Sequence, residues 1–392
     1  MIYLDNSATT MHKPQAVIDA VCGAMTSFGG PGRGSHQAAL DASMAVFGAR
    51  QAVSDLLGAW GAGSVSFALN ATMALNIAIE GLLPAGGVAV TTAASHNSVL
   101  RPLNRARDER GCQVRVAAIL PDGSLDWGSY EQALAGASLV AVTHASNVTG
   151  DVYDIERMAA AAHDAGALFI LDAAQTAGAW AFSASAIGAD VVCFTGHKSL
   201  YGPQGTGGLC VRPGLDVSPL VEGGSGVHSF DERHPRFMPE ALEAGTANAH
   251  GLAGLAAGCA WLAERGVADV QAHVESLVAR FLECVADIDG VRVLGGGSGR
   301  RCGIVSVNVG DADSGEIYYH LNYNKATGET LETLENCLIG VRRAMEQGAK
   351  VDGAGVFYWP SFLGEDTKYK PSRNPYYDFE ADQRAWKALW LN

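Results

Sequence analysis

The most constraining feature of the sequence is the stretch from Ala189 to Gly208, which is centred on Lys198. An apolar run, Val191 to Phe194, predicts a buried strand that leads into Thr195-Gly-His-Lys198, and a glycine-rich segment follows. A strand end holds a lysine in a fixed place, and glycines let a ligand approach the backbone closely. The stretch therefore suits a lysine that forms a Schiff base, although a lysine in an exposed surface loop is the alternative.

A second stretch upstream favours the Schiff-base interpretation. The run Leu168 to Leu171 predicts a buried parallel strand with Asp172 at its carboxyl end, and open α/β sheets bind their ligands at that edge. A carboxylate there can keep the pyridine nitrogen of pyridoxal phosphate protonated, so that the ring acts as an electron sink. Asp172 alone could equally be a helix cap. Together with Lys198 it predicts a pyridoxal phosphate site, in which Gln175 would reach the ring hydroxyl.

A third motif predicts where the phosphate of such a cofactor binds. The expected strand Val65 to Leu69 leads into Asn70 to Asn76, which reads as the start of a helix. Free backbone N–H groups and the helix dipole make a helix start of this kind an anion site. We therefore expect Thr72 and Met73 to contact the phosphate, with an ordinary capped helix as the alternative.

These motifs, with Tyr3-Leu-Asp-Asn-Ser-Ala-Thr-Thr10 near the start, are similar to those of the class V aminotransferase superfamily in its cysteine desulfurase branch. The resemblance runs from Tyr3 to about Gly296 and then as far as about residue 347. It implies an α/β chain of fold type I, with a large domain built on a mostly parallel seven-stranded sheet and a small α/β domain. The implied boundaries are 12–250 for the large domain, 1–11 with 251–350 for the small one, and 351–392 for an aromatic-rich tail.

The resemblance also implies roles for individual residues. Lys198 would form the Schiff base and move protons, His96 would stack on the cofactor ring, and Asn147 would hydrogen-bond a ring oxygen. Thr246 would reach the phosphate of the neighbouring subunit, which implies a homodimer with shared sites. The residues expected to bind the cofactor are Thr72, Met73, His96, Asn147, Asp172, Gln175, Thr195, His197, Lys198 and Thr246.

The resemblance fails near the end of the expected small domain. We expect a short helix from Ser314 to Leu321, capped by Asp313, and a longer one from Gly328 to Gln347. Between two such helices the family has a strand with a substrate-binding arginine and a mobile loop with the cysteine that attacks the substrate sulfur. The connection from Asn322 to Gly328 contains neither residue. Cys337 is expected to pack inside its helix, Cys302 comes too early in the chain, and Arg373 in the tail is a candidate for the missing arginine.

Composition excludes several other classes of protein. The net charge of −14 argues against nucleic acid or an anionic membrane as a partner. The eight cysteines form no C-x-x-C pair, so we expect neither a metal site nor a disulfide framework. No apolar run approaches the roughly 20 residues of a membrane span, and the N-terminus enters a strand without a signal-type segment. We therefore expect a cytoplasmic protein.

Three functions are compatible with the sequence. The first is cleavage of the C–S or C–Se bond of a cysteine-like amino acid, by elimination or with an external thiol because the usual persulfide cysteine is missing. A sulfur acceptor protein would then be a partner. The second is another pyridoxal phosphate reaction on an amino acid, such as transamination or epimerisation. The third is a non-catalytic homologue that keeps the cofactor.

Overall fold

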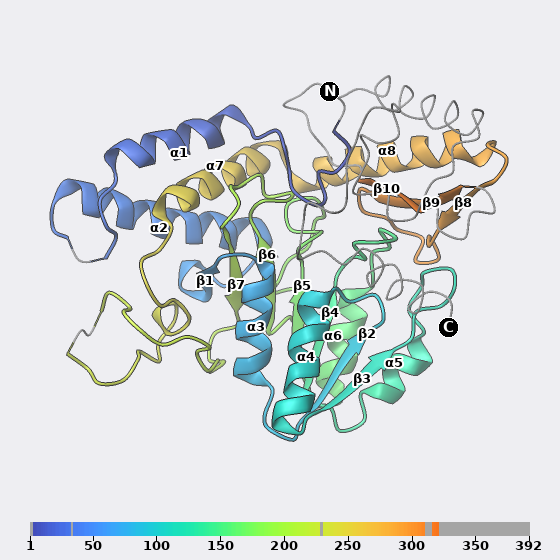
Figure 1. Cartoon of the computed structure of the whole chain (residues 1–392), viewed down its shortest axis with the longest axis horizontal. Coiled ribbons are helices and arrows are strands. Elements are labelled where there is room, and N and C mark those ends of the chain that lie inside the picture. Colours follow the sequence, from blue (N-terminus) through green and yellow to red (C-terminus); the bar gives the residue numbers. More distant parts are fainter. Residues whose placement is uncertain (1–2, 33, 228–229, 310–315, 321–392) are drawn as a thin grey trace, which may run out of the picture. The chain divides into compact units, whose positions relative to one another are not determined.

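The computed structural model describes residues 3–32, 34–227, 230–309 and 316–320 (Figure 1). These residues fall into two compact units, and each is described separately. The first unit contains residues 3–280, 295–305 and 319–320, and the second contains 281–294 and the described part of 306–318. The sheet and the predicted site belong to the first unit.

A seven-stranded sheet forms the centre of the first unit, in the order β1-β7-β6-β5-β4-β2-β3. All its strands except β7 run parallel to one another, because β7 is antiparallel to both of its neighbours. The prediction of a mostly parallel seven-stranded sheet is therefore confirmed. The strands are β1 (Val65–Ala68), β2 (Val88–Thr92), β3 (Gln113–Ala117), β4 (Leu139–Thr143), β5 (Leu168–Asp172), β6 (Val191–Thr195) and β7 (Gly207–Val211).

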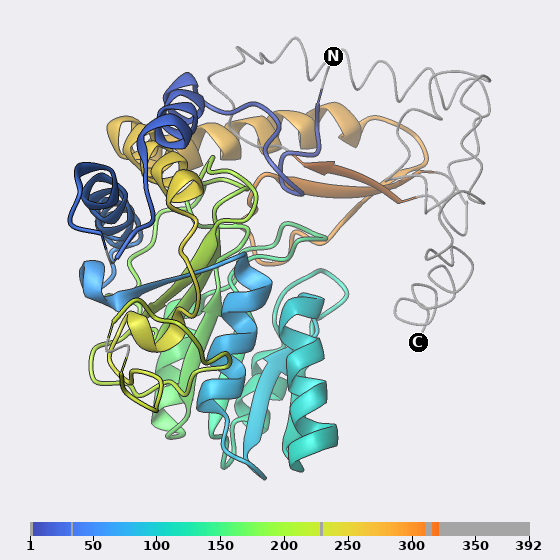
Figure 2. The same ribbon diagram turned by 60° about the vertical axis from the view of Figure 1, so that its left-hand side comes forward.

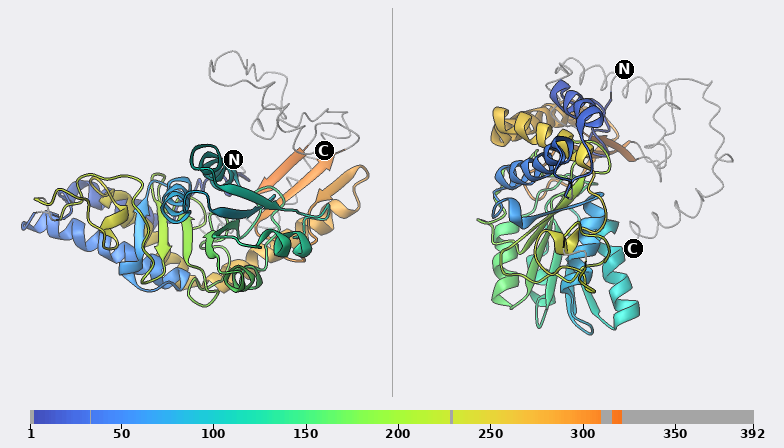
Figure 3. Two further views of the ribbon diagram at one scale, coloured as in Figure 1. Left: turned by 90° about the horizontal axis from the view of Figure 1, so that it is seen from below. Right: turned by 90° about the vertical axis from the view of Figure 1, so that its left-hand side faces the viewer.

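Helices cover both faces of this sheet. Those described are α1 (Gln15–Ser27), α2 (Gln37–Leu57), α3 (Ala71–Leu82), α4 (Asn97–Arg110), α5 (Trp127–Ala133), α6 (Ile155–Asp164), α7 (Ala249–Arg265) and α8 (Val267–Ala286). The apolar residues of α3 and α4 pack on one face, and those of α2, α5, α6 and α7 pack on the other. Helices α1 and α2 both lie against α7 (Figures 2 and 3).

The alternation of side chains along the strands explains this two-sided packing. In β4, Leu139 and Ala141 face α3 and α4, whereas Val140 and Val142 face the opposite layer. Every residue of β4, β6 and β7 is buried, because a strand in a sheet covered by helices on both sides is buried on both faces and is largely apolar. These apolar runs are what make the strands recognisable in the sequence.

The second unit corrects one prediction from the sequence. Its three-stranded sheet has the order β10-β9-β8, with β8 (Val291–Leu294) antiparallel to β9 (Ile304–Val309). The third strand, β10 (Glu316–His320), occupies most of the range where a helix from Ser314 to Leu321 was expected. Ile317 and the two tyrosines after it favour a strand, and a single pair of apolar residues at i and i+4 is weak evidence for a helix. The expected helix 328–347 and the tail 351–392 lie outside the described residues.

Candidate active site

The predicted site residues come from different strands that end at one edge of the sheet. Because β1, β2, β4, β5 and β6 are parallel, their carboxyl ends lie on the same side. Thr72 and Met73 follow β1, His96 follows β2, Asn147 follows β4, Asp172 and Gln175 lie at the end of β5, and Thr195, His197 and Lys198 lie at the end of β6. Thr246 instead lies in the loop before α7. The roles of these residues stay predictions.

Asp172 ends β5, Lys198 follows the neighbouring strand β6, and the two side chains act on each other electrostatically. Burial raises the pKa of Asp172, while the N–H of Ala174, 3.0 Å from Oδ1, and the Lys198 ammonium oppose this rise. Burial lowers the pKa of Lys198, and Asp172 is the strongest of the groups that oppose the shift. A lysine with a lowered pKa has a larger neutral fraction, and the neutral amine is the form that attacks a carbonyl carbon. This pair is therefore suited to Schiff-base chemistry.

The N-terminal segment binds the backbone that carries Lys198. The N–H of Thr10 donates to the carbonyl of His197 over 2.9 Å, and its hydroxyl donates to the carbonyl of Lys198 over 2.5 Å. The hydroxyl of Thr9 lies 3.1 Å from Nδ1 of His197. The side-chain amide of Gln175 donates to the carbonyl of Ser7 over 3.4 Å. The motif near the chain start thus contacts the segment that carries His197 and Lys198.

The end of β6, which carries Thr195, lies close to the start of α3 by way of Gly207 in β7. Thr195 pairs with Gly207 of β7. A Cβ added to Gly207 would lie 2.6 Å from Cα of Asn70, the residue that caps α3. Only glycine allows this close approach of the strand to the helix start. The hydroxyl of Thr195 is buried and has no hydrogen-bond partner among the described residues.

The start of α3 has the side-chain cap that was the alternative interpretation of this motif. The side chain of Asn70 accepts a 3.0 Å hydrogen bond from the N–H of Met73. The hydroxyl of Thr72 is exposed and lies 2.8 Å from the hydroxyl of Ser98, which in turn lies 2.9 Å from Nδ1 of His96. The cap occupies the N–H of Met73, whereas Thr72 presents a hydroxyl at the same helix end.

The surroundings of His96 and His197 lower the pKa of both imidazoles, which favours their neutral form. Burial, the Lys198 ammonium and the Lys13 ammonium lower the pKa of His197 to about 4. The ring of His96 is exposed on its outer side, yet surrounding protein atoms and the Lys198 and Arg101 cations lower its pKa. At neutral pH both imidazoles are therefore uncharged, and Nδ1 of His96 accepts a hydrogen bond from the N–H of Ser98.

The remaining predicted residues have less definite surroundings. Asn147 is half-buried in the loop after β4, and Thr246 is exposed. The segment before Thr246 is anchored, because Glu243 forms a two-fold ion pair with Arg50 whose N–O distances are 2.5 and 2.7 Å. The N–H of Gly245 also donates to the carbonyl of Gly224 over 2.7 Å. Thr246 is thus presented at the surface by a segment with fixed ends.

Sequence reasoning missed two residues near Lys198. Lys13 lies at the end of the N-terminal segment, and its Nζ donates to the carbonyl of His197 over 3.4 Å. Cys302 is buried and influences the pKa of Lys198, although the sequence suggested that it comes too early in the chain to matter. The Lys13-Pro14 pair is a local signal for the start of helix α1, directly after the segment that contacts His197 and Lys198. Nothing local to Cys302 indicated its place.

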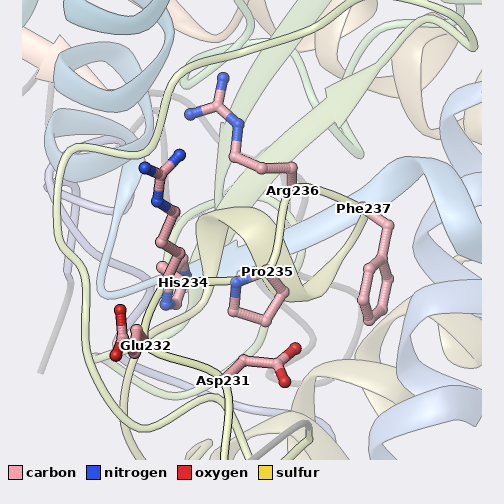
Figure 4. A pocket seen from close by; sticks show the side chains of 7 residues that line it. Asp231, Glu232, His234, Pro235, Arg236 and Phe237 are labelled. Atoms are coloured by element: carbon pink, nitrogen blue, oxygen red, sulfur yellow. The ribbon is translucent and has the colours of Figure 1, made fainter.

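Two surface hollows among the described residues lie away from the predicted site residues. One of about 550 Å³ is lined by residues 231–237, which are mostly charged and belong to an exposed loop (Figure 4). Another of about 300 Å³ lies nearby, between residues 214–217 and Arg236, Met238 and Ala241. Neither contains a predicted site residue. Among the described residues there is also no cluster of side chains able to hold a metal ion.

The fold and the site together define a class of protein. A mostly parallel sheet with a lysine and a carboxylate at adjacent strand ends is the arrangement of a fold type I pyridoxal phosphate enzyme. The sequence profile of the aminotransferase class-V family matches residues 2–330. The chain therefore belongs to this family, whose members are pyridoxal phosphate-dependent enzymes.

The similarity to individual proteins supports the same family. The chain is 33% identical over 323 residues to a probable cysteine desulfurase of Methanothermobacter thermautotrophicus. The aligned region covers 81% of this chain and 80% of the relative. It is 32% identical over 305 residues to a probable cysteine desulfurase of Vibrio cholerae, covering 75% of each chain. Among solved structures, a cysteine desulfurase of Thermococcus onnurineus NA1 superposes with a TM-score of 0.81 at 29% identity, covering 88% of this chain and 95% of the other.

Proposed function

We propose that this enzyme breaks the Cβ–S or Cβ–Se bond of a cysteine-like amino acid without a persulfide-forming cysteine of its own. The observation that carries the proposal is the pairing of Lys198 with the buried Asp172 at adjacent strand ends. The relatives named as cysteine desulfurases support the choice of substrate class.

The residues fit a bound pyridoxal phosphate. Lys198 would hold it through Nζ, and Asp172 would face the pyridine nitrogen. The buried Thr195 hydroxyl, which has no protein partner in the described part of the chain, suits a phosphate oxygen. Thr72 and His197 would complete this phosphate site with Thr246 of the neighbouring subunit, and Met73, whose N–H is bonded to Asn70, would line it. Asn147 and Gln175 would serve the ring oxygen, and His96 would stack on the ring.

The bound cofactor supplies an electron sink that stabilises negative charge on the substrate carbons. Nζ of Lys198 can take the proton from the substrate Cα and return it later. The neutral ring of His96 cannot itself protonate the leaving sulfur unless it first gains a proton, so it is suited to relay one. Elimination from cysteine with water would give hydrogen sulfide, ammonia and pyruvate. Transfer to an external thiol would instead give alanine and the persulfide of that thiol.

The cysteines of the described residues support the absence of a persulfide step. Cys22 is exposed, but it lies on α1 rather than at the end of a sheet strand. Cys302 is near Lys198, and burial raises the pKa of its thiol to about 12. A thiol of that pKa stays protonated at neutral pH, whereas the thiolate is the nucleophile. Cys337 lies outside the described residues.

The test is to incubate the purified enzyme with L-cysteine, with and without dithiothreitol, and to measure sulfide, pyruvate and alanine. Sulfide together with pyruvate or alanine supports the proposal, and Lys198→Ala should abolish both. An absorbance change of the cofactor without sulfur release would favour transamination or epimerisation. No absorbance change with cysteine would favour a non-catalytic homologue.

We also propose that the enzyme is a homodimer. Leu40, Met44 and Phe47 lie on one face of α2, and the latter two are each 62% exposed. Large apolar side chains in a row on an exposed helix mark an interaction surface. A second copy of the chain would cover them and bring Thr246 to the neighbouring site. A sulfur acceptor protein as a further partner is likewise part of the proposal.

The proposed setting is the cytoplasm. No helix of the described residues is both long and apolar enough to cross a membrane. The charge of −14 supports a preference for small-molecule and protein partners over nucleic acid.

A further inference from the structure

The proposed phosphate site contains very little positive charge. Its side chains are the hydroxyls of Thr72, Thr195 and Thr246 and the imidazole of His197. A pKa of about 4 leaves that imidazole neutral at physiological pH. A phosphate monoester carries a charge of about −1.5 to −2 at pH 7, and a buried anion without a nearby cation is strongly disfavoured. The partial positive charge at the start of α3 balances only about half a unit of it.

Lys13 lies beside this site and forms no ion pair within the described residues. Its Nζ reaches only the backbone carbonyl of His197, at 3.4 Å. Its positive charge helps to lower the pKa of the His197 imidazole. Burial lowers the pKa of Lys13 to about 8, and no neighbouring anion counters this shift. A partly buried ammonium without a counter-ion is a place where an anion would bind.

The position of Lys13 in its own segment points the same way. It directly precedes Pro14, which caps α1 (Gln15–Ser27). The start of a helix carries partial positive charge and normally attracts acidic side chains rather than a lysine. Thr9 and Thr10 of the same segment bind the backbone of His197 and Lys198, so the segment holds Lys13 close to the site. An anion between Lys13 and His197 would neutralise the ammonium, which otherwise has no counter-ion among the described residues and lies at the positive end of a helix.

We propose that Lys13 is the cation that balances the phosphate of the cofactor. This inference rests on the proposed function, because it requires pyridoxal phosphate at Lys198. Lys198 cannot fill the role, since its Nζ is assigned to the carbonyl carbon of the cofactor. Lys13 is thus a binding residue that connects the N-terminal segment to cofactor retention.

The experiment compares pyridoxal phosphate with pyridoxal, which has the same ring and aldehyde but no phosphate. The apo-enzyme is titrated with each compound, and the dissociation constant is measured from visible absorbance for wild type, Lys13→Met, Lys13→Arg and Arg107→Met. Arg107 is exposed on α4, away from the site, and its replacement changes the net charge by the same amount. Circular dichroism confirms that each variant is folded.

We expect Lys13→Met to weaken binding of pyridoxal phosphate by about 10- to 100-fold, the range of a lost charge-assisted hydrogen bond. Binding of pyridoxal should be unchanged within about twofold. Lys13→Arg should keep most of the affinity, and Arg107→Met should behave like wild type. Added salt should weaken phosphate binding less in Lys13→Met than in wild type.

Three results would overturn the inference. Equal weakening for both compounds would mean that Lys13 supports the ring or the fold rather than the phosphate. Unchanged cofactor binding with a raised KM for the amino acid would mean that Lys13 binds the substrate carboxylate. If Lys13→Met does not fold, Lys13→Gln removes the same charge, and full selectivity for pyridoxal phosphate in a folded Lys13→Gln would overturn the inference. If the wild type binds neither compound, the proposed function itself fails, which is a distinct outcome.

Discussion

The hydroxyl of Thr10 donates a 2.5 Å hydrogen bond to the backbone carbonyl of Lys198, a residue 188 positions further along the chain. Thr10 is buried, and its N–H also donates to the preceding carbonyl, that of His197. Two hydrogen bonds from one residue therefore fix the peptide from which the lysine extends. An N-terminal segment with little secondary structure of its own thereby becomes part of the active-site support.

Thr10→Val should loosen this support. The substitution keeps the size of the side chain but leaves a buried carbonyl without its partner, which costs about 1–3 kcal/mol. We expect a lower unfolding temperature and slower formation of the visible absorbance band with pyridoxal phosphate. Thr26→Val is the matched control, because Thr26 is exposed on α1 and bonds only to its own helix. Equal behaviour of the two variants would contradict a supporting role for Thr10.

Lys198 should be the residue that carries the cofactor. Borohydride reduction of the holo-enzyme followed by peptide mass mapping should find the modification at Lys198, because it is the lysine next to the buried Asp172. Lys198→Ala should lose the modification. Lys13→Met, measured at saturating cofactor, should keep it. A modification of comparable yield on another lysine in wild type would refute the central assignment.

The stability of the apo-enzyme should depend on Lys13 at alkaline pH. Its pKa is about 8 in the folded protein and about 10.4 when unfolded, so the folded state binds fewer protons between these values. Stability contributed through Lys13 should therefore rise as pH increases from 8 to 10. His197 and Lys198 face the same region. Urea unfolding of wild type and Lys13→Met at both pH values isolates the effect, and identical pH slopes would argue against it.

No cysteine of the chain should be needed for sulfur release. Cys302→Ala and Cys337→Ser should leave the rate of sulfide formation within about twofold, since the first thiol is protonated by burial and the second is expected to pack in a helix. Trapping with a thiol-reactive probe after cysteine treatment is the direct measurement. Finding a substrate-dependent persulfide on one cysteine, lost together with activity when that cysteine becomes serine, would overturn the proposed reaction.

The apolar row on α2 should be a dimer contact. Light scattering at micromolar concentration should give about twice the mass of 40.8 kDa for the wild type. Phe47→Glu should shift the population towards monomer, because a charge would be buried in the contact. The control is Gln132→Glu on α5, which adds the same charge at an exposed polar side chain outside α2. A monomeric wild type with full activity would be incompatible with the shared site.

Local sequence patterns determined most of the first unit. Buried parallel strands are apolar on both faces, so β4, β5 and β6 could be found as short apolar runs. A side chain directly after such a run must lie at the strand end, which is why Asp172 and Lys198 could be assigned to one edge. The roles of the other site residues came from the resemblance and remain predictions.

Only the tertiary structure decided which distant segments meet and how strongly their charges are desolvated. The contacts of Thr10 and Lys13 with residues 197 and 198 join segments that are far apart in the sequence, and no local pattern encodes such a pairing. The neutral state of His197 and the protonated thiol of Cys302 follow from burial, which depends on the packed chain. Strand β10 lies where a helix was expected because it pairs with β9, in agreement with the strand preference of Ile317 and the two tyrosines that follow it.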